Sequence, residues 1–64
     1  MPPRFLAGDL LKARGSHAIL SVRRVDPDQY VILWLTHSDG SPDFDSVPTA
    51  RPHDYGDQAW DWID

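Results

Sequence analysis

Two runs of strand-forming residues on either side of a tight turn constrain this chain more than any other feature. Apolar and polar side chains alternate along residues 17–25, and residues 30–36 are rich in β-branched and aromatic side chains. Both patterns are typical of β-strands. Between them lies Asp26-Pro27-Asp28-Gln29, where the fixed φ of proline at the second position suits a type I turn. The sequence therefore predicts a central antiparallel hairpin.

The register of this hairpin decides which side chains form the core. A two-residue loop at Pro27-Asp28 places the aliphatic residues of both strands on one face, whereas a shift by one residue turns one strand over. Because Pro27 cannot adopt a positive φ, the favoured type I′ loop is excluded and the register stays open. A single aliphatic core favours the first register. Its pairs are Leu20–Leu35, Val22–Leu33 and Arg24–Val31, and its expected core is Ala18, Leu20, Val22, Val31, Leu33 and Leu35.

The same register leaves a second apolar face that needs a cover or a partner. It consists of Tyr30, Ile32 and Trp34 beside Ser21, Arg23 and Val25. In one alternative, Trp60, Trp62 and Ile63 fold back over this face. In the other, the face binds a partner, because aromatic side chains with arginines at the rim are typical of interface anchors. The expected contact residues are then Tyr30, Trp34, Arg23 and Arg24.

The composition of the rest of the chain also favours strands and turns. The 64 residues contain no Glu, one Lys and six Pro, so common helix-forming residues are scarce. We expect one all-β domain over residues 1–64. Its further elements are an extended lead-in at 1–7, a short strand or helical turn at 10–14, a strand at 44–50, an irregular or 3₁₀ segment at 51–56 and an acidic, tryptophan-containing segment at 57–64.

The order of these elements resembles that of small SH3-like β-barrels, such as those of short bacterial and phage proteins and of KOW-type domains. The resemblance rests on residues 5–11 (Phe-Leu-Ala-Gly-Asp-Leu-Leu), on the central hairpin and on residues 47–51 as the penultimate strand. It covers residues 5–55 and implies a five-stranded antiparallel barrel or a strongly bent sheet. SH3-like folds host many unrelated functions, so the function must be argued from the residues.

Residues that could carry out catalysis are not arranged for it. Without Cys the chain cannot form disulfides or thiolate metal sites. His17, His37 and His53 have no metal-ligand spacing within one element. Asp43 and Asp45 would point the same way on a strand, as on a solvated sheet edge. No glycine-rich phosphate loop or nucleophile elbow is present. We therefore expect no enzymatic activity, no cofactor and no metal.

Charge is distributed unevenly along the chain, whose net charge is −4. Residues 1–32 carry five cations against three aspartates, and residues 33–64 carry one arginine against seven aspartates. The acidic surface expected at the C-terminal end either keeps the tryptophans soluble or imitates a nucleic acid towards a basic protein. A nucleic-acid-binding role like that of KOW-type domains is disfavoured by the few cations and the pI near 5.0. The aspartates of that surface are Asp54, Asp57, Asp61 and Asp64.

The function that these observations favour is a non-enzymatic protein-binding module, in a bacterial or phage accessory protein. An acidic nucleic-acid mimic that inhibits a basic host protein and a KOW-like nucleic-acid-binding domain are the alternatives. The longest apolar run, residues 30–35, is far shorter than a membrane span, and the N-terminal residues do not resemble a signal peptide. We expect a cytoplasmic location, another protein as the partner and no membrane contact.

Overall fold

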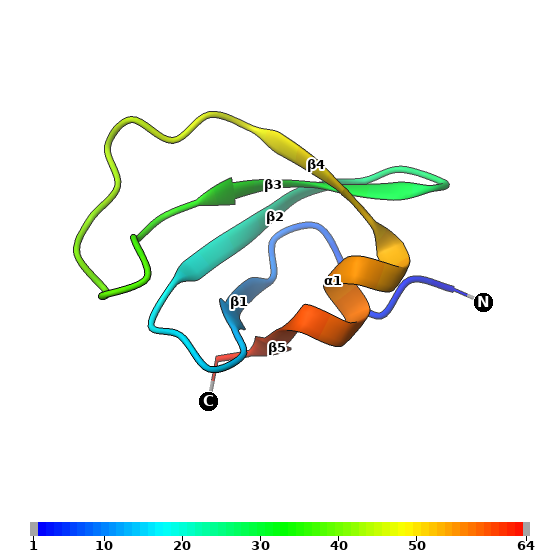
Figure 1. The fold of residues 1–64 in the computed structure, drawn as a ribbon. Helices are drawn as coiled ribbons and strands as arrows, with labels where there is room; N and C mark the ends of the chain where they lie inside the picture. The colour runs from blue at the N-terminus through cyan, green and yellow to red at the C-terminus, as the bar shows by residue number, and fades with distance from the viewer. Residues whose placement is uncertain (1, 64) are drawn as a thin grey trace.

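The computed structural model describes residues 2–63, which form one five-stranded antiparallel sheet and one short helix (Figure 1). The strands lie in the order β4-β3-β2-β1-β5, so the first and last strands are neighbours. The prediction of a mainly β fold is confirmed. The elements are β1 (Leu10–Ala13), β2 (Ile19–Val25), β3 (Gln29–Trp34), β4 (Thr49–Pro52), α1 (His53–Ala59) and β5 (Trp60–Trp62).

The β2–β3 hairpin contains a β-bulge that the sequence prediction missed. Arg24 pairs with Val31 as expected. The register then shifts between Val22 and Arg24, so Val22 pairs with Ile32 and not with Leu33. A bulge inserts one extra residue into one strand only. Relative to Leu20 and Val22, every side chain of β3 therefore lies on the opposite face of the sheet from the one predicted. The expected pairs Val22–Leu33 and Leu20–Leu35 are wrong.

This shift exchanges the two faces of β3. Tyr30 and Ile32 are fully buried, whereas Val31 and Leu33 are only partly buried and Leu35 is exposed. The expected core is therefore wrong for β3. It is right for the other strand, where the buried residues are Ala18, Leu20 and Val22. The residues of the observed core are Phe5, Leu11, Leu20, Val22, Tyr30, Ile32 and Trp60.

Trp60 covers the aromatic face of the hairpin. Its ring is buried and meets that of Trp34 edge-on, with the ring centroids 6.3 Å apart. The alternative in which the C-terminal segment folds over this face is thus confirmed for Trp60. Trp62 instead packs edge-on against Phe5 at 5.1 Å and stays half exposed, and Ile63 is also exposed.

Helix α1 lies over the core side of the sheet (Figure 1). We expected an irregular or 3₁₀ segment at 51–56, but an α-helix begins at His53, directly after Pro52. Proline can precede a helix because its missing N–H would have no partner there. Gly56 allows a close approach, since a Cβ at this position would lie 2.7 Å from Cζ3 of Trp60. No helix within residues 2–63 is long and apolar enough to cross a membrane.

Residues 35–48 form a long connection between β3 and β4. The strand expected at 44–50 begins only at Thr49. The connection is held by an isolated bridge between Thr36 and Pro42 and by a bond from the N–H of Asp43 to the carbonyl of Leu35, 3.0 Å long. We call residues 35–48 the β3–β4 loop.

Candidate binding surface

The four expected contact residues do not form one surface. Tyr30 is fully buried, so its ring offers a partner no area, and its expected contact role is corrected to a structural one. Trp34 lies on the same, core-facing side and is partly buried against Trp60. Arg23 and Arg24 are exposed on β2, on the other face of the sheet.

The hydroxyl of Tyr30 joins the N-terminal segment to helix α1. It accepts hydrogen bonds from the backbone N–H groups of Arg4 at 3.0 Å and Phe5 at 3.2 Å, and it donates one to the carboxylate of Asp57. Burial, and then the bond to Asp57, raises the pKa of Tyr30 above its ordinary value. Tyr30 therefore stays protonated and acts as a structural link.

The side of the sheet that faces away from the core is apolar. Directly paired residues of antiparallel strands share a face, and Ser21 pairs with both Leu10 and Leu33. Ile63 extends this face, since its N–H bonds to the carbonyl of Leu10 at 3.4 Å. We call this surface the outer face. Its central residues are Leu10, Ile19, Ser21, Val31, Leu33, Leu35 and Ile63, and the same pairing rule places Lys12, Arg24, Ala50 and Asp61 around them.

The outer face is only partly covered by its own neighbours. Leu10 is 50% exposed, and Leu35 and Ile63 are exposed as well. Ser21, at the centre, is only 9% exposed, and its Oγ has no hydrogen-bond partner within residues 2–63. An unpaired buried hydroxyl costs about 1–3 kcal/mol. The face therefore combines exposed apolar side chains with a polar group that the fold leaves unsatisfied.

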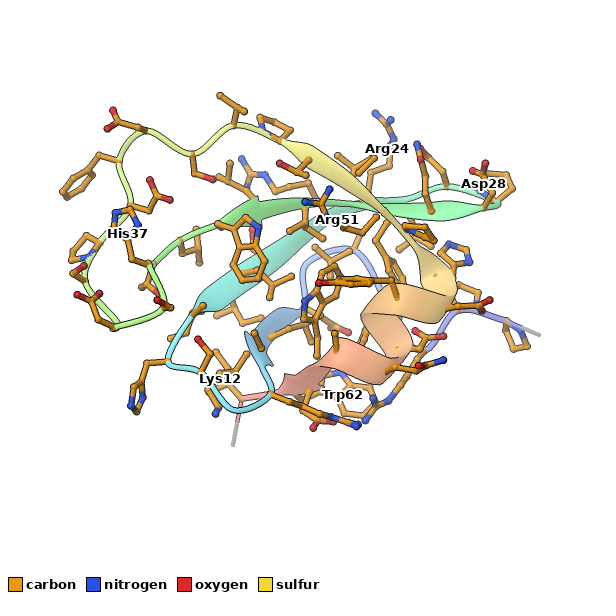
Figure 2. The ribbon with its side chains drawn as sticks, in the orientation of Figure 1. Lys12, Arg24, Asp28, His37, Arg51 and Trp62 are labelled. Atoms are coloured by element: carbon orange, nitrogen blue, oxygen red, sulfur yellow. The ribbon has the colours of Figure 1, made fainter. Side chains whose placement is uncertain are left out.

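Cations border the outer face at two places, which Figure 2 shows well apart. Lys12 pairs with Ile19 on β1 and β2, and its Nζ donates to the carbonyl of Ser16. At the β2–β3 turn, the bulge presents Arg23 and Arg24. Arg24 binds the carboxylate of Asp26 at 2.7 Å, whereas Arg23 forms no ion pair with any described residue. Asp61, which pairs with Lys12, also lies at this border but is bound by Arg4 and Arg14. The border is therefore basic on balance, although the chain as a whole is acidic.

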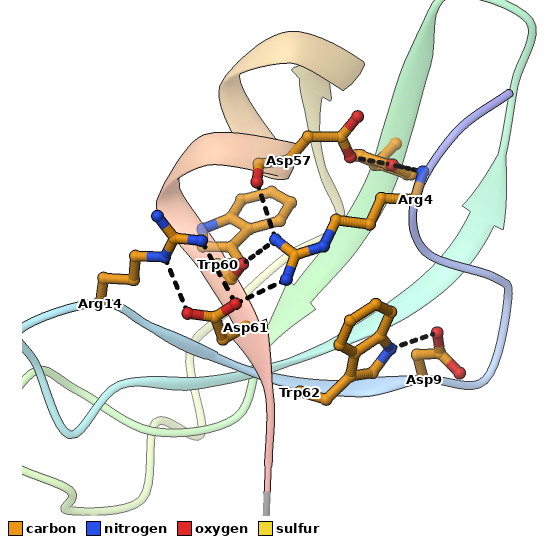
Figure 3. Close-up of polar contacts among 8 residues, drawn as sticks. Arg4, Asp9, Arg14, Asp57, Trp60, Asp61 and Trp62 are labelled. Atoms are coloured by element: carbon orange, nitrogen blue, oxygen red, sulfur yellow. Dashed lines mark hydrogen bonds and ion pairs between the residues drawn. The ribbon is translucent and has the colours of Figure 1, made fainter. Parts of the chain in front are cut away.

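The expected acidic surface is largely occupied by internal contacts. Arg4 and Arg14 each bind Asp61 at 2.7 Å (Figure 3). The hydrogen bonds from Arg14 and then Arg4 lower the pKa of Asp61 to about 2. Asp57 is half buried on the Tyr30 hydroxyl. Among the expected aspartates that the structure describes, this leaves Asp54 exposed on α1 without such a contact; Asp64 lies outside the described residues.

Arg4 also binds two backbone carbonyls at the C-terminal end. Its Nη1 donates to the carbonyl oxygens of Asp57 at 2.8 Å and Trp60 at 3.1 Å. Its guanidinium lies over the ring of Trp62, 4.6 Å from the centroid, and the Nε1–H of Trp62 donates to Asp9. Figure 3 shows these contacts together. A lead-in expected to be merely extended therefore fixes the C-terminal segment.

The three histidines lie in different surroundings. His53 packs on Tyr30, with the ring centroids 4.6 Å apart, and its buried Nε2 has no hydrogen-bond partner within residues 2–63. His37 lies 3.7 Å from the carboxylate of Asp43, and His17 is exposed. Within residues 2–63 no three metal-ligating side chains lie together, and no pocket is formed. The described surface thus offers an open face and not a cleft.

The residues that sequence reasoning missed are those of the outer face on β1 and β3 and at the C-terminal end. Leu10 was expected only as part of a first strand, and Leu33 as part of the core. The signal for Leu10 was its alternation with the buried Leu11, but the bulge that turns Leu33 outward has no marker residue in the sequence. No family model, curated protein or solved structure matches this chain.

Proposed function

We propose that this chain is a non-enzymatic, SH3-like protein-binding module, of the kind found in bacterial or phage accessory proteins. Its outer face holds an apolar segment of another protein that carries acidic residues on its flanks. The observation that carries this proposal is the combination on one face of exposed Leu10 and Ile63 with a basic border.

The connectivity supports the SH3-like part of the proposal. Most of the element order that carried the resemblance is present: a short first strand, a central hairpin, a polar loop and a penultimate strand. An α-helix follows where a 3₁₀-like segment was expected. The last strand, β5, also pairs with the first, β1, although the two are far apart in the sequence. Such an arrangement is expected of a sheet that bends around one small core.

The chemistry of the outer face fits a protein partner. Apolar side chains at the centre of an interface supply most of the affinity, because water is excluded there, whereas charges at the rim mainly steer and orient the partner. Leu10 and Ile63 are the apolar side chains of this face, and Lys12 and Arg23 are the charges at its rim. The partner's complementary segment is therefore apolar at its centre and acidic at its ends.

The two alternative functions have less support. An acidic mimic needs free carboxylates, but Asp61 is bound by two arginines and Asp57 by Tyr30. A nucleic-acid binder needs stacking side chains beside its cations, and the outer face contains no aromatic residue. Neither alternative makes use of the apolar outer face.

The proposal can be tested by cross-linking and binding measurements. A photo-reactive amino acid is placed at position 10 on the outer face and, as a control, at position 28 in the β2–β3 turn. The protein cross-linked from position 10 and not from position 28 is identified, purified and titrated against wild type, Leu10→Asp and Asp54→Ser.

We expect Leu10→Asp to weaken binding at least tenfold and Asp54→Ser to leave it unchanged. The affinity should fall little between low and moderate salt, because apolar contacts are not screened. Equal affinity of Leu10→Asp and wild type would contradict the proposal. So would a captured nucleic acid whose affinity falls steeply with salt, which would favour the KOW-like alternative.

A further inference from the structure

Phe44 is an exposed aromatic residue that the proposed outer face does not explain. It lies in the β3–β4 loop and is 91% exposed. Asp43 and Asp45 flank it, and the exposed Val47 follows. A large apolar side chain that is almost entirely exposed to water does not stabilise the core. Such a side chain is typical of an intermolecular contact, which would bury it.

The loop holds Phe44 in a defined place. The carboxylate of Asp43 accepts a hydrogen bond from the N–H of Asp45 at 3.1 Å and lies 3.7 Å from His37. The N–H of Asp43 bonds to the carbonyl of Leu35 on the other side of the loop. A segment that is already ordered loses less conformational entropy when it binds. The loop therefore presents an aromatic anchor beside the exposed Asp45, whereas the carboxylate of Asp43 is largely buried within the loop.

This loop has the chemistry that the outer face requires of a partner. The loop is apolar at Phe44 and negative at the exposed Asp45, whereas the outer face is apolar at Leu10 and Leu33 and positive at its border. Because Phe44 is almost fully exposed, it does not cover the outer face of its own molecule. One chain thus carries both halves of a complementary pair, which only two molecules can bring together.

We propose that Phe44 of one copy binds the outer face of a second copy, head to tail. This inference rests on the proposed function of the outer face. The contact joins two different surfaces, so a pair keeps one free outer face on the first molecule and one free loop on the second, and further copies can add until a ring closes. With one aromatic anchor and few charges, we expect a Kd on the order of 0.1–1 mM.

A complementation experiment separates this arrangement from a symmetric dimer. Phe44→Ala removes the loop anchor but keeps the outer face, and Leu10→Asp spoils the outer face but keeps the loop. Both residues are at least half exposed, so both variants should fold, which circular dichroism checks. Sedimentation is measured up to about 1 mM protein at 0.15 M salt, where the Debye length of about 8 Å screens the net repulsion.

We expect wild type to associate with rising concentration and each variant alone to stay monomeric. Their mixture should form a one-to-one dimer that grows no further, because only one loop and one outer face remain active. A wild type that is monomeric at every concentration would overturn the inference. So would association of Phe44→Ala alone, or a mixture that stays monomeric while wild type associates.

The sedimentation experiment and the cross-linking test of the proposed function can fail separately. A monomeric wild type that still captures another protein from position 10 refutes self-association and keeps the binding module. A head-to-tail dimer with no other protein captured from position 10 supports self-association and removes the separate partner.

Discussion

The terminal junction and the β3–β4 loop are held in opposite ways. In the terminal junction, which we define as Arg4, Phe5, Tyr30, Asp57, Trp60 and Asp61, hydrogen bonds join residues from 25 to 57 positions apart in the sequence. The start of the β3–β4 loop, at Thr36 and Ser38, is bonded to residues 16–19. Further along the loop, the side-chain hydrogen bonds of Asp39 and Asp43 reach only two residues along the chain. The junction surrounds a buried aromatic cluster, whereas the loop exposes Phe44.

This difference separates the residues that stabilise the fold from those available for binding. Bonds between distant segments break only when the tertiary structure opens, whereas bonds within a loop contribute little to global stability. A substitution in the junction should therefore lower the free energy of unfolding. A substitution in the loop should leave it unchanged and alter only association.

The largest expected effect is that of Phe5→Ala. Phe5 is fully buried and contacts both Tyr30 and Trp62, so its loss should cost about 3–5 kcal/mol. Small domains have little stability in reserve, and the variant should be largely unfolded in urea titrations followed by tryptophan fluorescence. Phe44→Ala is the matched control and should stay within about 0.5 kcal/mol of wild type. Equal effects of the two changes would remove the distinction between the two regions.

The next effect is that of Gly56→Ala in helix α1. Alanine normally stabilises a helix relative to glycine, but a Cβ here would lie 2.7 Å from Trp60 and 2.8 Å from Cδ2 of Tyr30. Both rings are buried and have little room to move, so we expect destabilisation of about 1–3 kcal/mol. The exposed Gln58→Ala on the same helix is the control and should be neutral or slightly stabilising. A higher melting temperature for Gly56→Ala would show that the helix packs less tightly on Trp60.

A smaller effect is expected from Tyr30→Phe, which keeps the ring and removes the hydroxyl. The N–H groups of Arg4 and Phe5 then lose their acceptor, at a cost of about 1 kcal/mol.

The pKa of Tyr30 adds a test at high pH. It is raised in the folded state, mainly by burial, so above pH of about 10 the unfolded chain releases this proton while the folded chain keeps it. The stability that this group contributes is therefore present below that pH and is lost as the pH rises further. Urea titrations between pH 8 and 11 should show a steeper loss for wild type than for Tyr30→Phe, and parallel curves would contradict the assignment.

The smallest effect concerns Asp61, which lies at the surface of the junction. Its pKa is lowered to about 2 by hydrogen bonds from Arg14 and Arg4. The stability that it contributes is complete above the unfolded pKa of about 4 and is lost as the pH falls towards 2. We expect a shallow step in wild-type stability over this interval, measured by thermal unfolding, and a weaker step in Asp61→Asn. The control Asp45→Asn, in the loop, should keep the wild-type step.

The sequence predicted the parts of the fold that local patterns determine. The hairpin turn, the mainly β content and the cover by Trp60 all follow from proline at a turn, β-branched runs and an unprotected aromatic face. The bulge between Val22 and Arg24 escaped prediction because no glycine or proline marks it. Its effect was large, since a one-residue slip turned Tyr30 from an expected contact into a core residue.

The candidate site was predictable only in part for the same reason. The sequence grouped Arg23 and Arg24 with Tyr30 and Trp34. Both arginines are exposed, but which apolar residues lie beside them depends on the register. The ion pair between Arg4 and Asp61 joins residues 57 positions apart, and no local pattern indicates such a contact. Through that contact Asp61, which belongs to the acidic C-terminal segment, helps to hold the fold together.

The guanidinium of Arg4 has a consequence for how the sheet can grow. β5 is an edge strand, and edge strands with free carbonyl groups invite pairing with strands of other molecules. Arg4 binds the carbonyl of Trp60 at 3.1 Å, so an incoming strand would have to displace a charged side chain before it could form its first hydrogen bond there. The side chain of Arg4 thus opposes β-augmentation and amyloid-like stacking along β5.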